Sequence, residues 1–129
     1  MNGEQVNVNE RLLRWGPVVL VASGILVASV VRTAEGQPAR GLLGVGADKW
    51  LHAVGYGVLA GTIAVALRRR PTVGGLALVV GLTVGYGIAI ELVQLPLSSR
   101  SASLLDVVAD GVGAVVAAVL YRARQYTPA

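Results

Sequence analysis

The sequence predicts an all-α polytopic membrane protein, a bundle of about four transmembrane helices. Of its 129 residues, 54% are hydrophobic and only 14% are charged, and the mean hydropathy is +0.67. A soluble domain of this length has too little interior to bury so much apolar chain. The long apolar segments also lack the polar face that a helix of a soluble bundle shows. We expect one domain over residues 1–129, embedded in a lipid bilayer.

Four apolar segments define the expected spans, since about 20 apolar residues are needed to cross a bilayer. They cover residues 15–31, 48–67, 73–95 and 103–121. The first segment is short for a span and has Pro17 at its start, where proline is tolerated. A cleaved signal peptide over residues 11–34 is the competing interpretation, but the acidic residues Glu4 and Glu10 precede it, where such peptides carry few acids.

The basic residues predict the orientation of the four spans. An even number of spans places both termini on one side, together with the loop between the second and third spans. That side carries seven basic residues and the other side carries four, so both termini are expected in the cytoplasm of a cell-membrane protein. The seven are Arg11, Arg14, Arg68, Arg69, Arg70, Arg122 and Arg124, and the four are Arg32, Arg40, Lys49 and Arg100.

Charge and composition also exclude several classes of function. The net charge is +4, but the basic residues stand in short groups between apolar segments, so nucleic acid is not an expected partner. The absence of cysteine excludes disulfides, thiolate chemistry and Cys-rich metal sites. Two small-xxx-small spacings, Gly57 to Gly61 and Gly81 to Gly85, predict that the second and third spans pack closely. The oligomeric state stays open.

The polar side chains gather at the outer ends of the expected spans. Spacings of three and four residues place them in one stripe on each helix. Because charges at membrane depth face the bundle interior or a wet cavity, the stripes predict a polar pocket open to the outer leaflet. They consist of Asp48, His52 and Tyr56 in the second span, Glu91 and Gln94 in the third, and Asp106 and Asp110 in the fourth, with Lys49 and the loop residues Arg100, Ser101 and Ser103 in the same layer.

These residues follow an ordered pattern over residues 47–119. It reads Asp48-Lys49-x-x-His52-x-x-x-Tyr56, then Tyr86-Gly87-Ile88-x-x-Glu91-x-x-Gln94, then Arg100-Ser101-x-Ser103-x-x-Asp106-x-x-Ala109-Asp110-x-x-Gly113. The pattern resembles the VanZ-like family of small membrane proteins, named for a protein associated with resistance to the glycopeptide teicoplanin. The resemblance implies a cell-envelope setting and no particular reaction or cofactor. Where that family commonly has Asn, this chain has Asp110.

His52, Glu91 and Asp106 are the candidate catalytic residues. His52 is the only histidine and suits proton transfer, with Asp48 one turn away to fix its tautomer. The structural alternative is that His52 bonds to Glu91 or Asp106 and joins the helices. Asp48 suits an N-cap equally well. Glu91 is either functional or paired with Arg100 or Lys49.

The remaining polar residues are candidates for ligand binding. Lys49 and Arg100 could hold an anionic headgroup, because a guanidinium among hydroxyls suits a phosphate or carboxylate. Asp106 and Asp110 could share a proton or a cation, and Gln94 and Tyr56 are better structural partners than ligands. The full set of binding candidates is Asp48, Lys49, Tyr56, Gln94, Arg100, Ser101, Ser103 and Asp110.

Two functions from different classes follow from this site. One is a protein that binds, and modifies, an anionic lipid or another envelope component. The other is a non-enzymatic scaffold or ligand-binding protein whose polar cluster is structural. A metal site of His52 with Asp48, Glu91 and Asp106 is a weaker alternative, because it offers one imidazole. A transporter is the weakest, since four short helices leave little room for alternating access.

Overall fold

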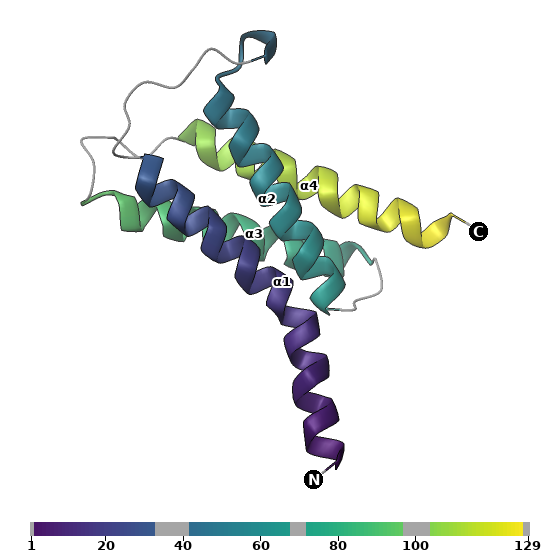
Figure 1. Cartoon of the computed structure of the whole chain (residues 1–129). Coiled ribbons are helices and arrows are strands. Elements are labelled where there is room, and N and C mark those ends of the chain that lie inside the picture. Colours follow the sequence, from purple (N-terminus) through teal and green to yellow (C-terminus); the bar gives the residue numbers. More distant parts are fainter. Residues whose placement is uncertain (1, 33–41, 68–71, 97–103, 128–129) are drawn as a thin grey trace.

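Apolar segments in lipid form helices because every backbone polar group must be satisfied within the segment. The computed structural model describes residues 2–32, 42–67, 72–96 and 104–127, with side chains from residue 7 onward. Four of its helices are long and apolar enough to cross a membrane, which confirms the predicted all-α polytopic fold. They are α1 (Asn2–Arg32), α2 (Ala47–Leu67), α3 (Val73–Gln94) and α4 (Leu104–Tyr126), and a 3-10 turn, η1 (Leu42–Gly44), precedes α2 (Figure 1).

Helix α1 is much longer than the segment expected from the sequence. Its 31 residues include the polar stretch that precedes residue 15. At 1.5 Å per residue α1 measures about 46 Å, whereas the hydrocarbon core of a bilayer is about 30 Å thick. Figure 1 shows α1 bending part-way along, with its N-terminal part turned away from the other helices. Pro17 lies inside the helix, and a proline removes one backbone hydrogen bond and kinks the helix.

Helix α2 is the centre of the bundle and contacts the other three long helices. Its inward face supplies most of the buried core, and α3 and α4 contribute Val79 and Ala114. Partly buried side chains of α1 cover this core from one side. The core residues of α2 are Tyr56, Leu59, Ala60, Ile63 and Ala64.

The closest backbone approach joins α2 to α4. A side chain at Gly113 would collide with the backbone carbonyl of Ala53, and a Cβ added at Gly57 would lie 3.2 Å from the carbonyl oxygen of Gly113. The expectation that two glycine spacings pack α2 closely against α3 is therefore wrong. A Cβ at Gly61, Gly81 or Gly85 would meet nothing within 4 Å, so only Gly57 of that set lies at a tight contact, and its partner is α4.

Three side-chain hydrogen bonds to backbone carbonyls attach α1 to its neighbours. Tyr86 of α3 donates to the carbonyl of Ala22 at 2.6 Å, and Gln94 of α3 donates to that of Ser29 at 2.8 Å. Arg14 donates to the carbonyl of Ala66 at 2.7 Å. Ser29 and Ala66 lie in the last turns of α1 and α2, where carbonyls have no partner within the helix.

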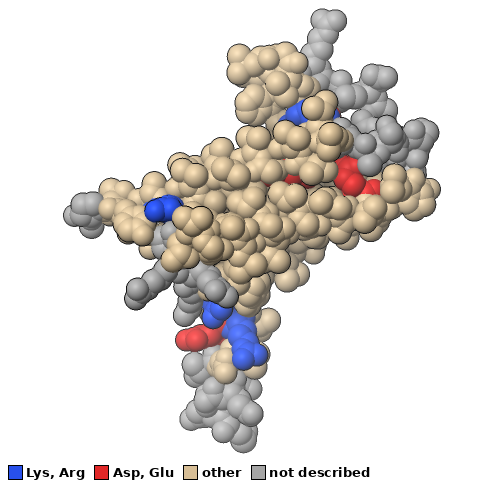
Figure 2. All heavy atoms as spheres, turned by 180° about the vertical axis from the view of Figure 1, so that it is seen from behind, with Lys and Arg blue, Asp and Glu red and all other residues tan. Residues whose placement is uncertain are grey.

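The outer surface of the bundle is apolar. Large side chains such as Leu20, Val65 and Leu92 are more than half exposed, as expected of residues that face acyl chains rather than water. Figure 2 shows one face of the molecule, on which charged side chains appear toward the ends and leave the middle uncharged. With the four helices, this surface makes the chain a multi-pass membrane protein.

Candidate functional site

The start of α2 places its charged residues against α4. The carbonyl of Gly46 accepts hydrogen bonds from the backbone N–H groups of Lys49 and Trp50, so Gly46 precedes the first turn. Asp48 lies inside that turn, and its predicted role as N-cap is wrong. Its carboxylate still lies at the helix N-terminus, where negative charge is favourable.

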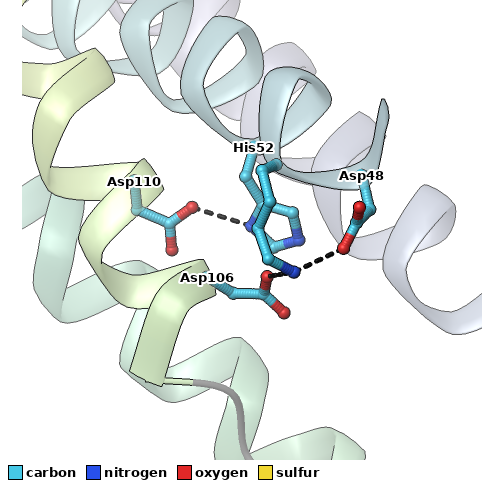
Figure 3. Close-up of polar contacts among 5 residues, drawn as sticks. Asp48, His52, Asp106 and Asp110 are labelled. Carbon is cyan, nitrogen blue, oxygen red and sulfur yellow. Dashed lines mark hydrogen bonds and ion pairs between the residues drawn. The ribbon is translucent and has the colours of Figure 1, made fainter. Parts of the chain in front are cut away.

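Lys49 forms an ion pair with a carboxylate on each helix. Its Nζ lies 2.5 Å from Oδ2 of Asp48 and 2.5 Å from Oδ1 of Asp106. Figure 3 shows Asp48 and His52 on α2 facing Asp106 and Asp110 on α4. Lys49 thus pairs with these two carboxylates rather than with Glu91, and its charge is neutralised within the cluster.

His52 is paired with Asp110. Its Nδ1 lies 2.8 Å from Oδ1 of Asp110, whose side chain is 1% exposed. The predictions that His52 bonds to Asp48, or alternatively to Glu91 or Asp106, are wrong. Asp106 and Asp110 have different side-chain partners, Lys49 and His52 respectively. An ionised carboxylate only accepts hydrogen bonds, so with Asp110 ionised the proton of this contact belongs to Nδ1 of His52.

Aromatic packing and a glycine hold this pair in place. The rings of His52 and Tyr56 are stacked with centroids 5.8 Å apart, and Tyr86 lies 6.4 Å beyond Tyr56. Gly87 of α3 faces both groups: an added Cβ would collide with Oδ2 of Asp110 and lie 3.2 Å from the Tyr56 ring. Tyr56 is 2% exposed and packs between His52 and Tyr86.

A cavity of about 450 Å³ lies beside this cluster. Its two walls differ in chemistry. The residues from α1 are apolar except for Ser29. All the carboxylates, the imidazole, the phenol and the amide come from α2, α3 and α4, and α2 adds the apolar residues Leu51, Gly55 and Val58. The apolar lining residues are Val21, Gly24, Ile25, Ala28, Leu51, Gly55 and Val58, and the polar ones are Ser29, Asp48, His52, Tyr56, Glu91, Gln94 and Asp106.

Six of the eleven candidate residues line this cavity. Lys49 and Asp110 do not line the cavity but are paired with residues that do. Arg100, Ser101 and Ser103 lie outside the described residues. Two contributors were missed. Ser29 gave no signal in the sequence, because its role depends on where α1 packs. Gly87 stands in the quoted pattern beside Tyr86, which could have indicated its close approach to the site.

The cluster has carboxylates and an imidazole, which are ligands for metal ions. Within residues 2–32, 42–67, 72–96 and 104–127, no three or more of these groups are arranged to hold one. The charged groups of the cluster pair with one another instead. What the arrangement offers chemically is a set of carboxylates beside a histidine that is paired with one of them.

Comparison with known proteins gives one finding. The model of the VanZ/LLP1 family matches residues 5–125, which includes all four long helices and the whole cluster. No curated protein and no solved structure matches the chain.

Proposed function

The chain belongs to the VanZ/LLP1 family, and we propose that it is a cell-envelope protein whose cavity binds the polar part of a membrane lipid or of a lipid-linked envelope component. The division of the cavity into a polar wall and an apolar wall carries this proposal. Such a division suits an amphiphile, whose headgroup meets the ends of α2, α3 and α4 while its chain follows α1. Ionisable residues at membrane depth are costly, which favours a functional role for them.

The ligand is expected to present hydroxyl or amine groups to the polar wall. The carboxylates of Asp48, Glu91 and Asp106 border the cavity, and ionised carboxylates accept hydrogen bonds. Lys49 is held between two of them and has little attraction left for an anion. In this proposal an anionic group of the ligand is therefore held by Arg100, which the sequence assigns to the same end of the bundle.

The same geometry supports a modifying activity based on proton transfer. His52 borders the cavity and is bonded through Nδ1 to a buried carboxylate. Its Nε2 would take the proton of a ligand hydroxyl, and Asp110 would stabilise the imidazolium that forms. In this proposal Glu91 or Asp106 acts with His52 in moving this proton.

A purely structural role is the second candidate, and one observation favours it. The Lys49–Asp106 and His52–Asp110 contacts both join α2 to α4. If the cluster only joins helices, Glu91→Gln will lower the thermal stability of the purified protein. If the cluster binds or modifies a ligand, Glu91→Gln will stay folded at nearly the original melting temperature and lose the response described next.

A histidine signal tests the binding proposal, because His52 is the only histidine. The protein labelled with ¹⁵N-histidine is placed in nanodiscs of pure phosphatidylcholine or of an envelope lipid extract. We expect the His52 ring nitrogens to shift in the extract. Gly24→Leu should abolish that shift, because Gly24 lines the cavity and an added Cβ there meets nothing within 4 Å.

The matched control lies on the same helix. Gly16 also has open space around an added Cβ but does not line the cavity, so Gly16→Leu should keep the shift. Identical signals in both nanodiscs, or a shift that persists in Gly24→Leu, would contradict the proposal.

A further inference from the structure

A second cavity, which the proposed function does not use, lies between α1 and α2 toward the other end of the bundle. It measures about 520 Å³ and shares only Val58 with the first cavity. Pro17, the proline inside α1, borders this cavity. Its lining residues are Glu10, Leu13, Arg14 and Pro17 from α1 and Val58, Gly61, Thr62 and Val65 from α2.

Two opposite charges border this otherwise mainly apolar groove. Glu10 and Arg14 are one helical turn apart on α1, so they lie on the same face of the helix. Figure 2 shows acidic and basic side chains together at the projecting segment. The only other polar side chain in the lining, Thr62, donates its hydroxyl proton to the carbonyl of Leu59 at 2.8 Å. The charged lining therefore carries one positive and one negative group.

Arg14 is held in a fixed position. Its Nε donates to the carbonyl of Ala66 at 2.7 Å, which uses one of the five N–H donors of the guanidinium. The planar fork of a guanidinium matches the oxygens of a phosphate, and this geometry gives short, strong hydrogen bonds.

We propose that this groove binds one zwitterionic aminophospholipid. The phosphate lies on Arg14, the ammonium group donates to the carboxylate of Glu10, and an acyl chain follows Pro17, Val58, Gly61 and Val65. In this proposal Glu10 provides the selectivity. Its carboxylate would repel an anionic lipid that has no ammonium group, and it would accept hydrogen bonds from the ammonium group of an aminophospholipid. Burial of the acyl chain against apolar residues anchors the rest of the lipid.

Gly61 allows the groove to be filled without disturbing the bundle. An added Cβ at this position meets nothing within 4 Å, so the side chain of Gly61→Leu begins in open space inside the groove. Gly81 of α3 also has open space around an added Cβ and does not line the groove. Gly81→Leu is therefore the matched control for an added apolar side chain.

Native mass spectrometry of the full chain tests the proposal. The purified protein in mild detergent is given equal amounts of phosphatidylethanolamine, phosphatidylcholine and phosphatidylglycerol. We expect one retained lipid, predominantly phosphatidylethanolamine. Gly61→Leu should reduce its retention at least about tenfold, because the new side chain occupies the space of the acyl chain and about two buried methylene groups account for a tenfold change. Gly81→Leu should retain the lipid.

The headgroup contacts are tested separately. Glu10→Gln should abolish the preference for phosphatidylethanolamine over phosphatidylglycerol while keeping one bound phospholipid. Arg14→Gln should lower the retention of all three lipids, and Arg14→Lys should restore it in part. Equal retention of the three lipids by the original chain, a preference for phosphatidylglycerol, or unchanged retention in a folded Gly61→Leu variant would overturn the proposal and leave only ordinary lipid contacts at this face.

Discussion

At the scale of single residues, the sequence predicted which side chains gather but not how they pair. Helical spacing placed Asp48 and His52 on one face of α2, and it placed Asp106 and Asp110 on one face of α4. The partner of His52 depends on the relative height of the two helices, which spacing within one helix cannot supply. The structure pairs His52 with the deeper carboxylate, Asp110.

The His52–Asp110 pair predicts the tautomer of the imidazole. With Asp110 ionised, neutral His52 should carry its proton on Nδ1, and ¹⁵N NMR of the single histidine will report this form directly. Asp110→Asn introduces an amide, which can accept or donate at this position. We therefore expect the Nε2–H tautomer to become populated in the variant.

Asp106→Asn is the control for this prediction. It removes a carboxylate from the same helix, but one that is paired with Lys49 rather than with His52. The tautomer should be unchanged in this variant. A predominant Nε2–H form in the original chain would show that Asp110 does not accept a proton from Nδ1.

At the scale of helices, the contact between α2 and α4 explains the pairing of the charges. Gly57 and Gly113 let the two backbones approach, and this contact fixes their register, which brings Lys49 to Asp106 and His52 to Asp110. The sequence indicated close packing through glycine, but small-xxx-small spacings stand on several helices. Only the packing of the whole bundle decides which of them meets a partner, so α4 was not predicted as the partner of α2.

A pair of glycine substitutions in α4 tests this contact. In Gly113→Ala the new methyl group meets the backbone carbonyl of Ala53, which cannot rotate away. Forcing an extra methyl group into a packed contact costs about 1–3 kcal/mol, so we expect a lower free energy of unfolding. Denaturation of the purified protein with sodium dodecyl sulfate, followed by far-UV circular dichroism, measures this change.

Gly111→Ala provides the comparison within the same helix. An added Cβ there lies 3.8 Å from a methyl group of Val84, an ordinary contact, and alanine favours a helix over glycine by up to about 1 kcal/mol. This variant should be as stable as the original chain or slightly more stable. Equal destabilisation by both substitutions would mean that the close approach at Gly113 does not limit the packing.

At the scale of the whole molecule, the number and approximate bounds of the membrane-spanning helices could be read from hydropathy, because lipid leaves a segment few alternatives to a helix. The length of α1 could not be read from hydropathy. Its N-terminal part contains Glu10, Arg11 and Arg14, and hydropathy ends a span where charges begin. A helix continues through such residues as long as its backbone bonds are satisfied. At the C-terminal end of α4, the helix likewise continues past the expected limit at residue 121, and Arg122 lies 5.8 Å from the centroid of the Tyr126 ring.

The orientation of the bundle rests on the unequal distribution of basic residues and predicts which surfaces reagents can reach. Leu42, in the turn before α2, is 74% exposed, and Gln125 is exposed near the end of α4. The chain has no cysteine, so a single cysteine at either position is labelled without background. If both termini lie in the cytoplasm, as the distribution of basic residues predicts, a membrane-impermeant maleimide should label Leu42→Cys in intact cells and Gln125→Cys only after permeabilisation. The reverse result would place the Lys49–Asp106 and His52–Asp110 pairs at the cytoplasmic side and exclude an outward-facing cavity, and labelling of both positions in intact cells would rule out four crossings.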